Sequence, residues 1–305
     1  MARKDNDHAK TQIKTSFGRK VFLVCNAVFL TACALTCLLP MINLLAISFS
    51  SSSAVSTGQV SLWPVEFTLD SYSYMAGKPE FFDSLKMSLL RLVLAVPLSM
   101  FVCVLAAYPL SLENREFKAR KYYIWIFIVP MLFQGGLIPT YMVVRNAGLT
   151  DTIWALVLPS CVNVFNIILL MNFYRTIPKE LQEVAAIDGA GHFRILWQII
   201  LPISKPVIAT VLLFVIVNHW NSWFDGLIYM NTPSKYPLQT YLQTRVVNKN
   251  IKAAEAIRDF RNMSNISDRT GKAAQIFLAA VPVLIVYPFL QKYFTSGLVM
   301  GSVKE

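Results

Sequence analysis

Charged residues are scarce in this chain. Asp, Glu, Lys and Arg make up 15% of its 305 residues, whereas a typical soluble domain has about 25%. Apolar residues make up 55%, and the mean hydropathy is +0.50. This balance argues against a soluble enzyme, and the apolar content excludes intrinsic disorder. The net charge is +11, but the basic residues sit between long apolar runs and form no single face, so we expect no nucleic-acid partner.

Residue patterns of enzyme active sites are also missing. The three histidines are scattered without metal-ligand spacing, and no Cys-x-x-Cys pair occurs. Gly271-Lys272 lacks the upstream glycine of a phosphate-binding loop. The five cysteines all lie in apolar runs, where we expect them to be packing residues. The sequence therefore predicts a chain that is not an enzyme and that holds no metal or cofactor itself.

What the chain does contain is six long windows without charge. A membrane helix needs roughly 20 apolar residues, and lipid offers the backbone no hydrogen-bond partners, so each window is expected to be helical. The first window is too long for the apolar core of a signal peptide and predicts an uncleaved anchor. The sequence thus predicts an all-α integral membrane protein with six transmembrane helices. The windows are 21–49, 92–112, 122–144, 152–174, 206–224 and 273–291.

The distribution of Lys and Arg predicts the orientation of these spans. The first 20 residues hold six basic residues, and the connections 113–121 and 175–205 hold four each, so these segments are expected to be cytoplasmic. The predicted organisation is a cytoplasmic tail (1–20), a membrane domain (21–294) and a cytoplasmic C-terminal tail (295–305). The connection 232–272 disagrees with the charge rule, because it holds eight basic residues but falls outside.

The connection 175–205 has the pattern of two helices around a glycine. Pro178 suits the first turn of a helix, and Glu180 and Glu183 share a face near its positive end. Gly189 is expected to end this helix in a left-handed conformation. A second amphipathic segment contains Phe193, Leu196, Trp197 and Ile200 at helical spacing. The pattern alone leaves two readings open: an interfacial helix pair resting on lipid, or a docking site for a cytoplasmic partner.

The same connection resembles the EAA loop of binding-protein-dependent ABC importer permeases. Glu183, Ala185 and Gly189, followed by Ile199, Leu201 and Pro202, fit every spacing of that motif, and Asp188 and Ala190 fit its extended form. Val184 departs from the family, which has alanine there. Outside the loop, the segment 67–72 is similar to the family's first external loop. The segments 220–224 and 293–304 resemble the carbohydrate-uptake branch, which includes the maltose-type second permease and polysaccharide permeases.

This resemblance implies a type I ABC importer permease fold, a multi-pass location in the bacterial cytoplasmic membrane, and several partners. These are a second permease in a heterodimer, two ATPase subunits that bind ATP and Mg, and an extracytoplasmic solute-binding protein. It also implies that the loop is a coupling helix seated in the ATPase. The coupling residues would be Glu180, Glu183, Ala185, Asp188, Gly189, Ile199, Leu201 and Pro202.

Polar side chains within spans are candidates for the substrate pathway. Amides can pair with sugar hydroxyls, and indole rings can cover the apolar face of a sugar. The plainer interpretation is hydrogen bonding between helices and an interfacial aromatic belt. The function we expect is import of a sugar or oligosaccharide. The alternatives are a permease of the same type for another solute and a secondary transporter, although the six windows contain no ion-coupling charge. The candidates are Asn163, Asn166, Asn218, Trp220, Asn221 and Trp223.

The basic connection 232–272 has three possible roles. Its charge can be solvated, can meet anionic lipid headgroups, or can dock the solute-binding protein. Leu238, Tyr241, Leu242 and Arg245 lie at helical spacing, which favours an ordered segment. In the family the matching loop contacts the binding protein, so the resemblance implies docking by Arg245, Arg258 and Arg261.

Overall fold

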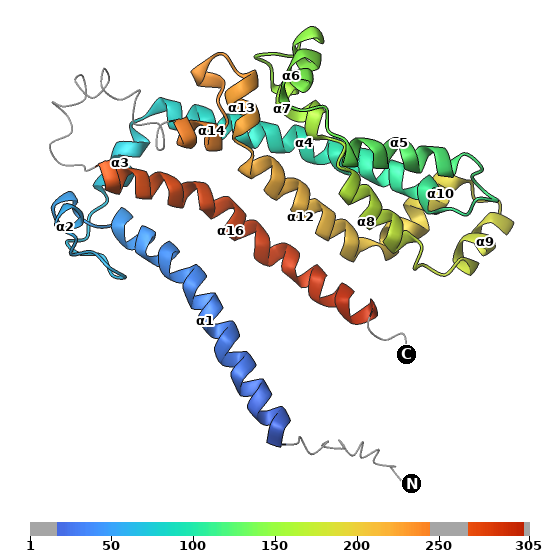
Figure 1. Cartoon of the computed structure of the whole chain (residues 1–305), viewed down its shortest axis with the longest axis horizontal. Helices are drawn as coiled ribbons and strands as arrows, with labels where there is room; N and C mark the ends of the chain where they lie inside the picture. Colours follow the sequence, from blue (N-terminus) through green and yellow to red (C-terminus); the bar gives the residue numbers. More distant parts are fainter. Residues whose placement is uncertain (1–16, 245–267, 302–305) are drawn as a thin grey trace, which may run out of the picture.

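The computed structural model describes residues 17–244 and 268–301, and within these ranges the regular structure is helical (Figure 1). Three helices are long and apolar enough to cross a membrane: α1 (Phe17–Ser48), α4 (Pro79–Ser111) and residues 269–288 of α16 (Asp268–Gly301). Three pairs of helices joined by bends can each supply one further span. The described part of the chain therefore has three to six spans by length and composition.

The other helices are shorter. Between α1 and α4 lie α2 (Ser52–Ser56) and α3 (Asp70–Ala76). The bent pairs are built from α5 (Arg120–Leu132), α6 (Leu137–Asn146), α7 (Ile153–Val157), a 3-10 turn (Leu158–Ser160), α8 (Val164–Tyr174), α10 (His192–Ile195), a π-helical turn (Leu196–Ile200), α11 (Leu201–Ile203) and α12 (Lys205–Asn221). The remaining elements are α9 (Glu180–Ile187), α13 (Phe224–Tyr229), a 3-10 turn (Pro233–Lys235) and α14 (Leu238–Leu242).

The helices extend beyond several of the charge-free windows. The second window was expected to begin after Arg91, but α4 begins at Pro79 and carries Arg91 inside it. Asp83 and Lys86 are exposed on the first turns of this helix, so charge there does not interrupt it. At the other end, α16 runs to Gly301, so most of the predicted 295–305 tail is helical.

The third window is not a continuous helix. It divides into α5 and α6, whose axes differ by 117°. Pro130 lies in the last turn of α5, and Gly136 has a φ of +82°, a left-handed conformation that glycine adopts without a Cβ penalty. The fourth window bends by 45° between Ser160 and Val164. Apolar length alone does not distinguish a straight span from such pairs.

The core is centred on α4, which packs against α8 and α12, while α16 packs against α1 and α12. One stripe of α4 is buried, at positions three or four apart that face the same side of a helix. Much of this stripe is small, which lets neighbouring helices approach closely. Its members include Ser84, Ser88, Arg91, Ala95 and Ser99.

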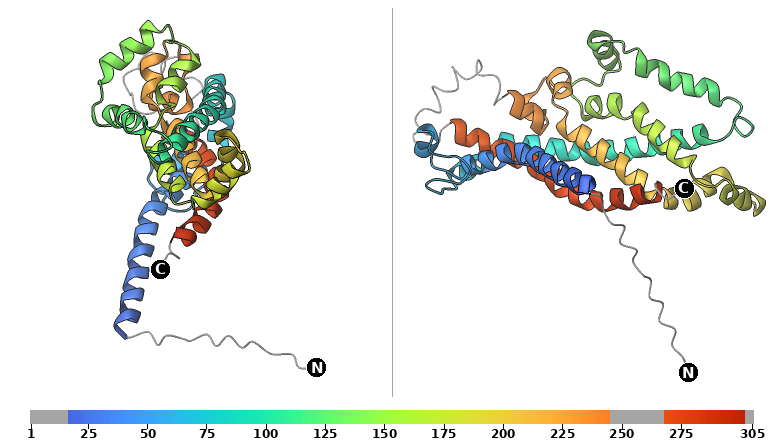
Figure 2. Two further views of the ribbon diagram at one scale, coloured as in Figure 1. Left: turned by 90° about the vertical axis from the view of Figure 1, so that its right-hand side faces the viewer. Right: turned by 60° about the horizontal axis from the view of Figure 1, so that its bottom comes forward.

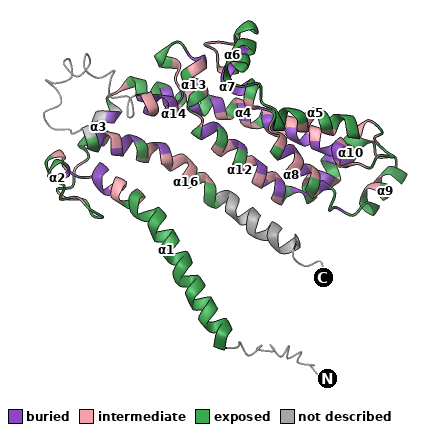
Figure 3. Ribbon diagram, viewed as in Figure 1, coloured by how far each residue is buried: buried purple, intermediate pink, exposed green. Residues whose placement is uncertain are grey.

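α1 stands apart from this core along most of its length, and only its C-terminal turn is buried, at Ala46, Ile47 and Ser48 (Figures 2 and 3). The prediction that all five cysteines pack in the core was therefore only partly correct. Cys103 and Cys161 are buried, but Cys25, Cys33 and Cys37 lie on the exposed surface of α1. The apolar character of a membrane helix does not tell whether protein or another apolar surface covers it.

Candidate functional site

The predicted helix–glycine–helix loop is present. α9 covers Glu180–Ile187, and Gly189 follows it with a φ of +79°, as the sequence indicated. A Cβ at Gly189 would meet no atom within 4 Å, so the requirement for glycine there is set by the backbone conformation and not by space. α9 projects at one end of the molecule, next to α10 (Figure 1).

α9 turns apolar side chains outwards. Ile187 is 84% exposed, Val184 58% and Leu181 44%, while Ala185 packs against the core. Glu180, Glu183 and Asp188 are also exposed. In the second segment, Ile195, Leu196 and Ile200 are buried, whereas Phe193 and Trp197 are exposed. Of the remaining motif residues, Ile199 and Leu201 are half-buried and Pro202 is exposed.

The loop is attached at both ends to the end of α4. Lys179, just before α9, forms an ion pair with Glu113. After the glycine, His192 Nδ1 lies 3.2 Å from the Tyr108 hydroxyl oxygen. The Leu110 carbonyl accepts hydrogen bonds from Arg120 (2.8 Å) and Arg175 (3.2 Å). α9 is thus held by its flanks, which leaves its own outer face uncovered by the described residues.

The six predicted pathway residues occupy different environments. Asn163 caps α8, where its side chain accepts a hydrogen bond from the Asn166 backbone N–H, and Asn166 is buried. Trp220 is 2% exposed, and its indole N–H donates to the Ala279 carbonyl at 2.9 Å. The structure thus places these three residues in helix capping and helix packing. Asn218 is exposed on α12.

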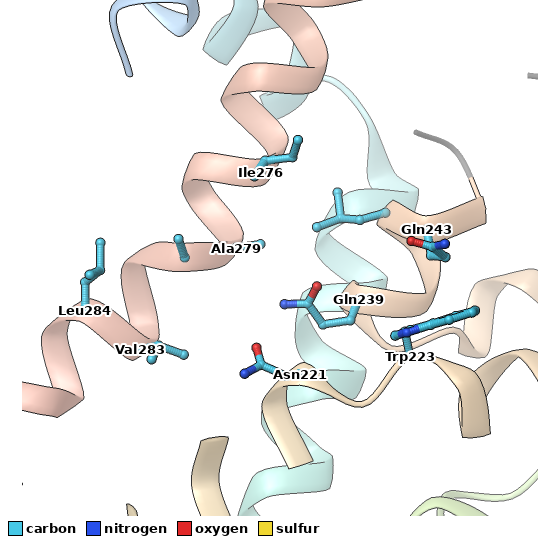
Figure 4. Close-up of a pocket in the computed structure, with 10 residues that line it drawn as sticks. Asn221, Trp223, Gln239, Gln243, Ile276, Ala279, Val283 and Leu284 are labelled. Atoms are coloured by element: carbon cyan, nitrogen blue, oxygen red, sulfur yellow. The ribbon is translucent and has the colours of Figure 1, made fainter. Parts of the chain in front are cut away.

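Asn221 and Trp223 line a cavity of about 410 Å³ beside α16 (Figure 4). Two further amides, Gln239 and Gln243, lie on the same side of this cavity. The facing wall is apolar and is made by Ile276, Ala279, Ala280, Val283 and Leu284 of α16. The arrangement offers amide donors and acceptors and one indole on one wall and hydrocarbon on the other.

The sequence analysis missed Gln239 and Gln243. They lie in the connection 232–272, which was interpreted through its positive charge. The spacing of Leu238, Tyr241 and Leu242 correctly indicated a helix there, and these three side chains are buried. Leu242 and the two glutamines line the cavity. The predicted docking residues Arg245, Arg258 and Arg261 lie outside the described residues.

A buried ion pair was also missed. The Arg91 guanidinium donates to both carboxylate oxygens of Asp225, with a distance of 3.3 Å from Nη1 to Oδ1. Both residues were taken as the ends of charge-free windows. Their opposite charges at the edges of two apolar runs were the available signal, but nothing in the sequence shows that the two runs are neighbours.

A second charged cluster joins two connections near α6 and α13. Asp151 has a φ of +59° and accepts hydrogen bonds from the backbone N–H groups of Asn231 (3.1 Å) and Thr232 (3.3 Å) and from Lys235 Nζ (2.6 Å). The Lys235 ammonium holds the pKa of the Asp151 carboxyl below its ordinary value, at about 2. Lys235 was counted among the basic residues of 232–272, and the structure gives it this local partner.

Long apolar helices, an exposed helix–glycine–helix loop and an amide-lined cavity define a membrane-embedded transport subunit. Comparison with known proteins agrees: residues 73–300 match the family of binding-protein-dependent transport system inner membrane components. The chain belongs to this family.

Three relatives illustrate the match. The chain is 40% identical over 294 residues to the protein LplC of Bacillus subtilis, covering 96% of this chain and 98% of LplC. It is 39% identical over 276 residues to the polygalacturonan/rhamnogalacturonan transport system permease protein YtcP of the same organism, covering 90% and 96%. A chain from the crystal structure of a bacterial ABC transporter involved in import of the acidic polysaccharide alginate superposes with a TM-score of 0.84 at 32% identity, covering 92% of this chain and 99% of that one. The fold is therefore that of an ABC importer permease.

Proposed function

We propose that this chain is one of two permease subunits of an ATP-driven importer, and that the solute is a sugar or oligosaccharide delivered by an extracytoplasmic binding protein. The observation that carries the proposal is the pairing of an exposed coupling-type loop with an amide-lined cavity in one membrane-embedded chain. Family membership supports the dependence on a binding protein. The polysaccharide relatives support a carbohydrate.

The membrane arrangement in this proposal has six spans with both termini in the cytoplasm. The three bent helix pairs then each count as one span. The end of the molecule that carries α9 also carries the basic α4–α5 connection, as the positive-inside rule requires of a cytoplasmic face. The chain would work in the bacterial cytoplasmic membrane.

On the cytoplasmic side, α9 is the proposed seat of the ATPase. Its exposed Leu181, Val184 and Ile187 offer an apolar ridge, and contiguous exposed apolar side chains favour a protein or membrane partner over water. Glu180 and Glu183 on the same short helix add negative charge, so the ATPase cleft should combine apolar walls with basic side chains. ATP and Mg would be bound by that ATPase and not by this chain.

On the other side of the membrane, the cavity wall of Asn221, Trp223, Gln239 and Gln243 is the proposed contact for the solute. Neutral amides can donate to and accept from hydroxyl groups, and the indole of Trp223 can lie against the apolar face of a sugar ring. Asn218 is retained as a candidate because its side chain is exposed. The basic connection 232–272 would supply Arg245, Arg258 and Arg261 for docking the binding protein.

A secondary transporter would need charged residues within its spans to couple ion movement to transport. The charge-free windows contain none, whereas the structure places Arg91 and Asp225 inside the helical bundle. These two charges neutralise each other through a bidentate pair, however, and leave no unpaired carboxylate for an ion. Family membership also favours ATP-driven import. A non-carbohydrate solute remains the second candidate within the family.

Two measurements test the proposal. Affinity purification of the chain from its native membrane should recover a second permease and an ATPase, and the purified chain alone should not hydrolyse ATP. The binding protein encoded with it should then be titrated calorimetrically with oligogalacturonides, maltodextrins and, as the non-sugar control, a peptide mixture. Binding of a saccharide supports carbohydrate import. Binding of peptides alone would replace the sugar by another solute, and ATPase activity of the isolated chain would contradict the subunit assignment.

A further inference from the structure

Arg91 is an unusual residue for its position. It lies about 18 Å from the start of α4, at 1.5 Å per residue, and it is only 1% exposed. The surrounding helix contains an 18-residue window with a mean hydropathy of 2.4. A buried charge in an apolar helix is costly unless it is paired, and such residues are rarely retained without a role. The polar groups around Arg91 indicate what that role is.

All of its hydrogen bonds go to one short segment, the break between α12 and α13. Arg91 Nε–H donates to His219 Nδ1 at 3.4 Å, and Nη1 donates to the Ser222 carbonyl at 3.4 Å. The two Nη groups together bind the Asp225 carboxylate. A guanidinium presents its donors in a fixed planar fork, which suits three acceptors at once; a lysine ammonium does not have this geometry.

The break depends on an outside donor. In a continuous helix the Ser222 carbonyl would accept from the Gly226 N–H, four residues later. Here the Gly226 N–H donates to Asp225 Oδ1 at 2.8 Å instead. Arg91 supplies the hydrogen bond that the Ser222 carbonyl would otherwise receive from its own helix. The guanidinium therefore donates a hydrogen bond to a carbonyl that the interrupted helix does not satisfy itself.

The break also carries one wall of the cavity. Asn221 and Trp223, on either side of Ser222, both line it. The opposite anchor of this segment is α14: the Thr240 hydroxyl donates to the Trp223 carbonyl at 2.7 Å. Gly226 packs so closely on α14 that a Cβ there would come within 2.9 Å of Pro237 Cδ. The segment is held between Arg91 on one side and α14 on the other.

We propose that Arg91 is a positioning residue of the transport cavity: by binding His219, Ser222 and Asp225 it fixes the α12–α13 break and so sets where Asn221 and Trp223 stand. This rests on the proposed function only in taking the cavity as part of the solute pathway. Arg91 itself does not line the cavity and acts through the break.

The test is the reactivity of a cysteine placed at the break. Ser222→Cys is introduced in the full chain, in membranes with its partner subunits, after the exposed Cys25, Cys33 and Cys37 are changed to alanine. The buried Cys103 and Cys161 are kept as reporters of the whole fold. The probe is a water-soluble maleimide, and labelling is followed at each cysteine by mass spectrometry. Arg91→Gln, Arg91→Lys and Asp225→Asn are compared with Lys86→Gln, which removes an exposed charge from the same helix.

Arg91→Gln and Asp225→Asn should each speed labelling of position 222 by roughly two- to 150-fold, the range that coupling between neighbouring groups spans. The double variant should be no faster than the faster single one, because both changes remove the same contact. Arg91→Lys should fall between wild type and Arg91→Gln, Lys86→Gln should match wild type, and Cys103 and Cys161 should stay unlabelled.

Two results would overturn the proposal. Unchanged labelling in Arg91→Gln would mean that the break is held without Arg91. Labelling of Cys103 and Cys161 together with position 222 would show that Arg91 supports the whole bundle and has no local positioning role. The assay uses no solute, so its outcome is separate from that of the calorimetric titration: a binding protein that ignores saccharides would refute carbohydrate import and leave the role of Arg91 as measured.

Discussion

Gly189 shows how one backbone conformation shapes the loop between α9 and α10. Its left-handed φ turns the chain between α9 and α10, and the space around it is open. Gly191, two residues later, also has open space but has an ordinary φ of −73°. The two glycines therefore differ in the conformation that they must adopt and not in the room around them, which makes them a matched pair.

Gly189→Ala should impair coupling, whereas Gly191→Ala should not. A residue with a Cβ in the left-handed region costs about 1–2 kcal/mol, which is roughly a five- to thirtyfold change in the population of the loop conformation. The measurement is the ATPase activity of the assembled importer in the presence of its loaded binding protein. Equal activities of the two variants would show that coupling does not require the left-handed conformation of Gly189.

Asp151, outside the predicted spans, is surrounded by hydrogen-bond donors. Lys235 and two backbone N–H groups stabilise its ionised form and lower its pKa to about 2. A carboxyl with a folded-state pKa below its unfolded value stabilises the fold above the unfolded pKa, near 3.8, and loses that contribution as the pH falls towards 2.

Asp151→Asn should therefore lower the thermal unfolding temperature of the detergent-solubilised chain at pH 7, and the gap to wild type should narrow as the pH is lowered from 4 to 2. The Asp151 side chain is partly exposed, so the difference in unfolding temperature should be small and should decrease in high salt. Lys86→Gln, from an exposed helical pair, is the control with little expected effect. A gap that is the same at every pH would mean that the ion pair does not contribute.

At the scale of elements, two tryptophans near the end of α12 have different surroundings. Trp220 and Trp223 are three residues apart and both belong to the predicted pathway set, yet their surroundings differ. Trp220 is buried with its N–H bonded to Ala279, whereas Trp223 is 37% exposed and faces the cavity.

Trp220→Phe should destabilise the chain, and Trp223→Phe should not. The first change removes a buried hydrogen bond and leaves a carbonyl without this donor, at a cost of about 1–3 kcal/mol. The second keeps an aromatic ring in the cavity but removes the indole N–H, so it should alter uptake and leave the unfolding temperature unchanged. Thermal unfolding and solute uptake are measured for both variants. A lower unfolding temperature of Trp223→Phe would show that Trp223 is a packing residue.

α4 connects the loop around α9 with the cavity. Near its C-terminal end, Tyr108 contacts His192, and Glu113 just after the helix pairs with Lys179. Further along its buried stripe, Arg91 reaches the break beside the cavity. The two contacts at this end of α4 differ in how much they contribute to stability. Lys179 and Glu113 are largely exposed, and such pairs contribute about 0–1 kcal/mol. The Tyr108–His192 contact is partly buried and brings α10 directly onto α4.

At the scale of the whole molecule, α9, α10 and the α4–α5 connection lie at one end (Figure 1), and their sequences contain Arg115, Lys118 and Arg194. The opposite end holds α13, α14 and the Asp151–Lys235 cluster. An even number of crossings is needed to put residues 113–121 and 175–205 on the same side of the membrane, and the α5–α6 and α7–α8 pairs supply it if each spans once.

Single cysteines should report this arrangement. In a background without Cys25, Cys33 and Cys37, Ile187→Cys on α9 should react with an impermeant reagent only in inverted membrane vesicles, and Asn146→Cys at the end of α6 only in right-side-out vesicles. Both parent residues are exposed, so access is not limited by packing within the chain. Reaction of both positions from the same side would show that the α7–α8 pair, which lies between them, turns back within the membrane, and the count of six spans would be wrong.

Local patterns in the sequence were sufficient for much of this protein. Scarce charge and long apolar runs indicate membrane helices, because lipid satisfies no backbone polar group. The pattern around Gly189 indicates a helix–glycine–helix loop, and Gly189 takes the predicted conformation because only its own backbone is involved.

Tertiary structure decided the rest. Arg91 and Asp225 are 134 residues apart, and Trp220 and Ala279 are 59 apart. Whether an arginine ends a span or is buried in the middle of a helix depends on a carboxylate that packing brings to it. In the same way, one tryptophan became a packing residue and another part of the cavity wall because α16 and α14 cover them differently. Periodicity records what a residue does within its own helix, and these roles depend on which other helix lies beside it.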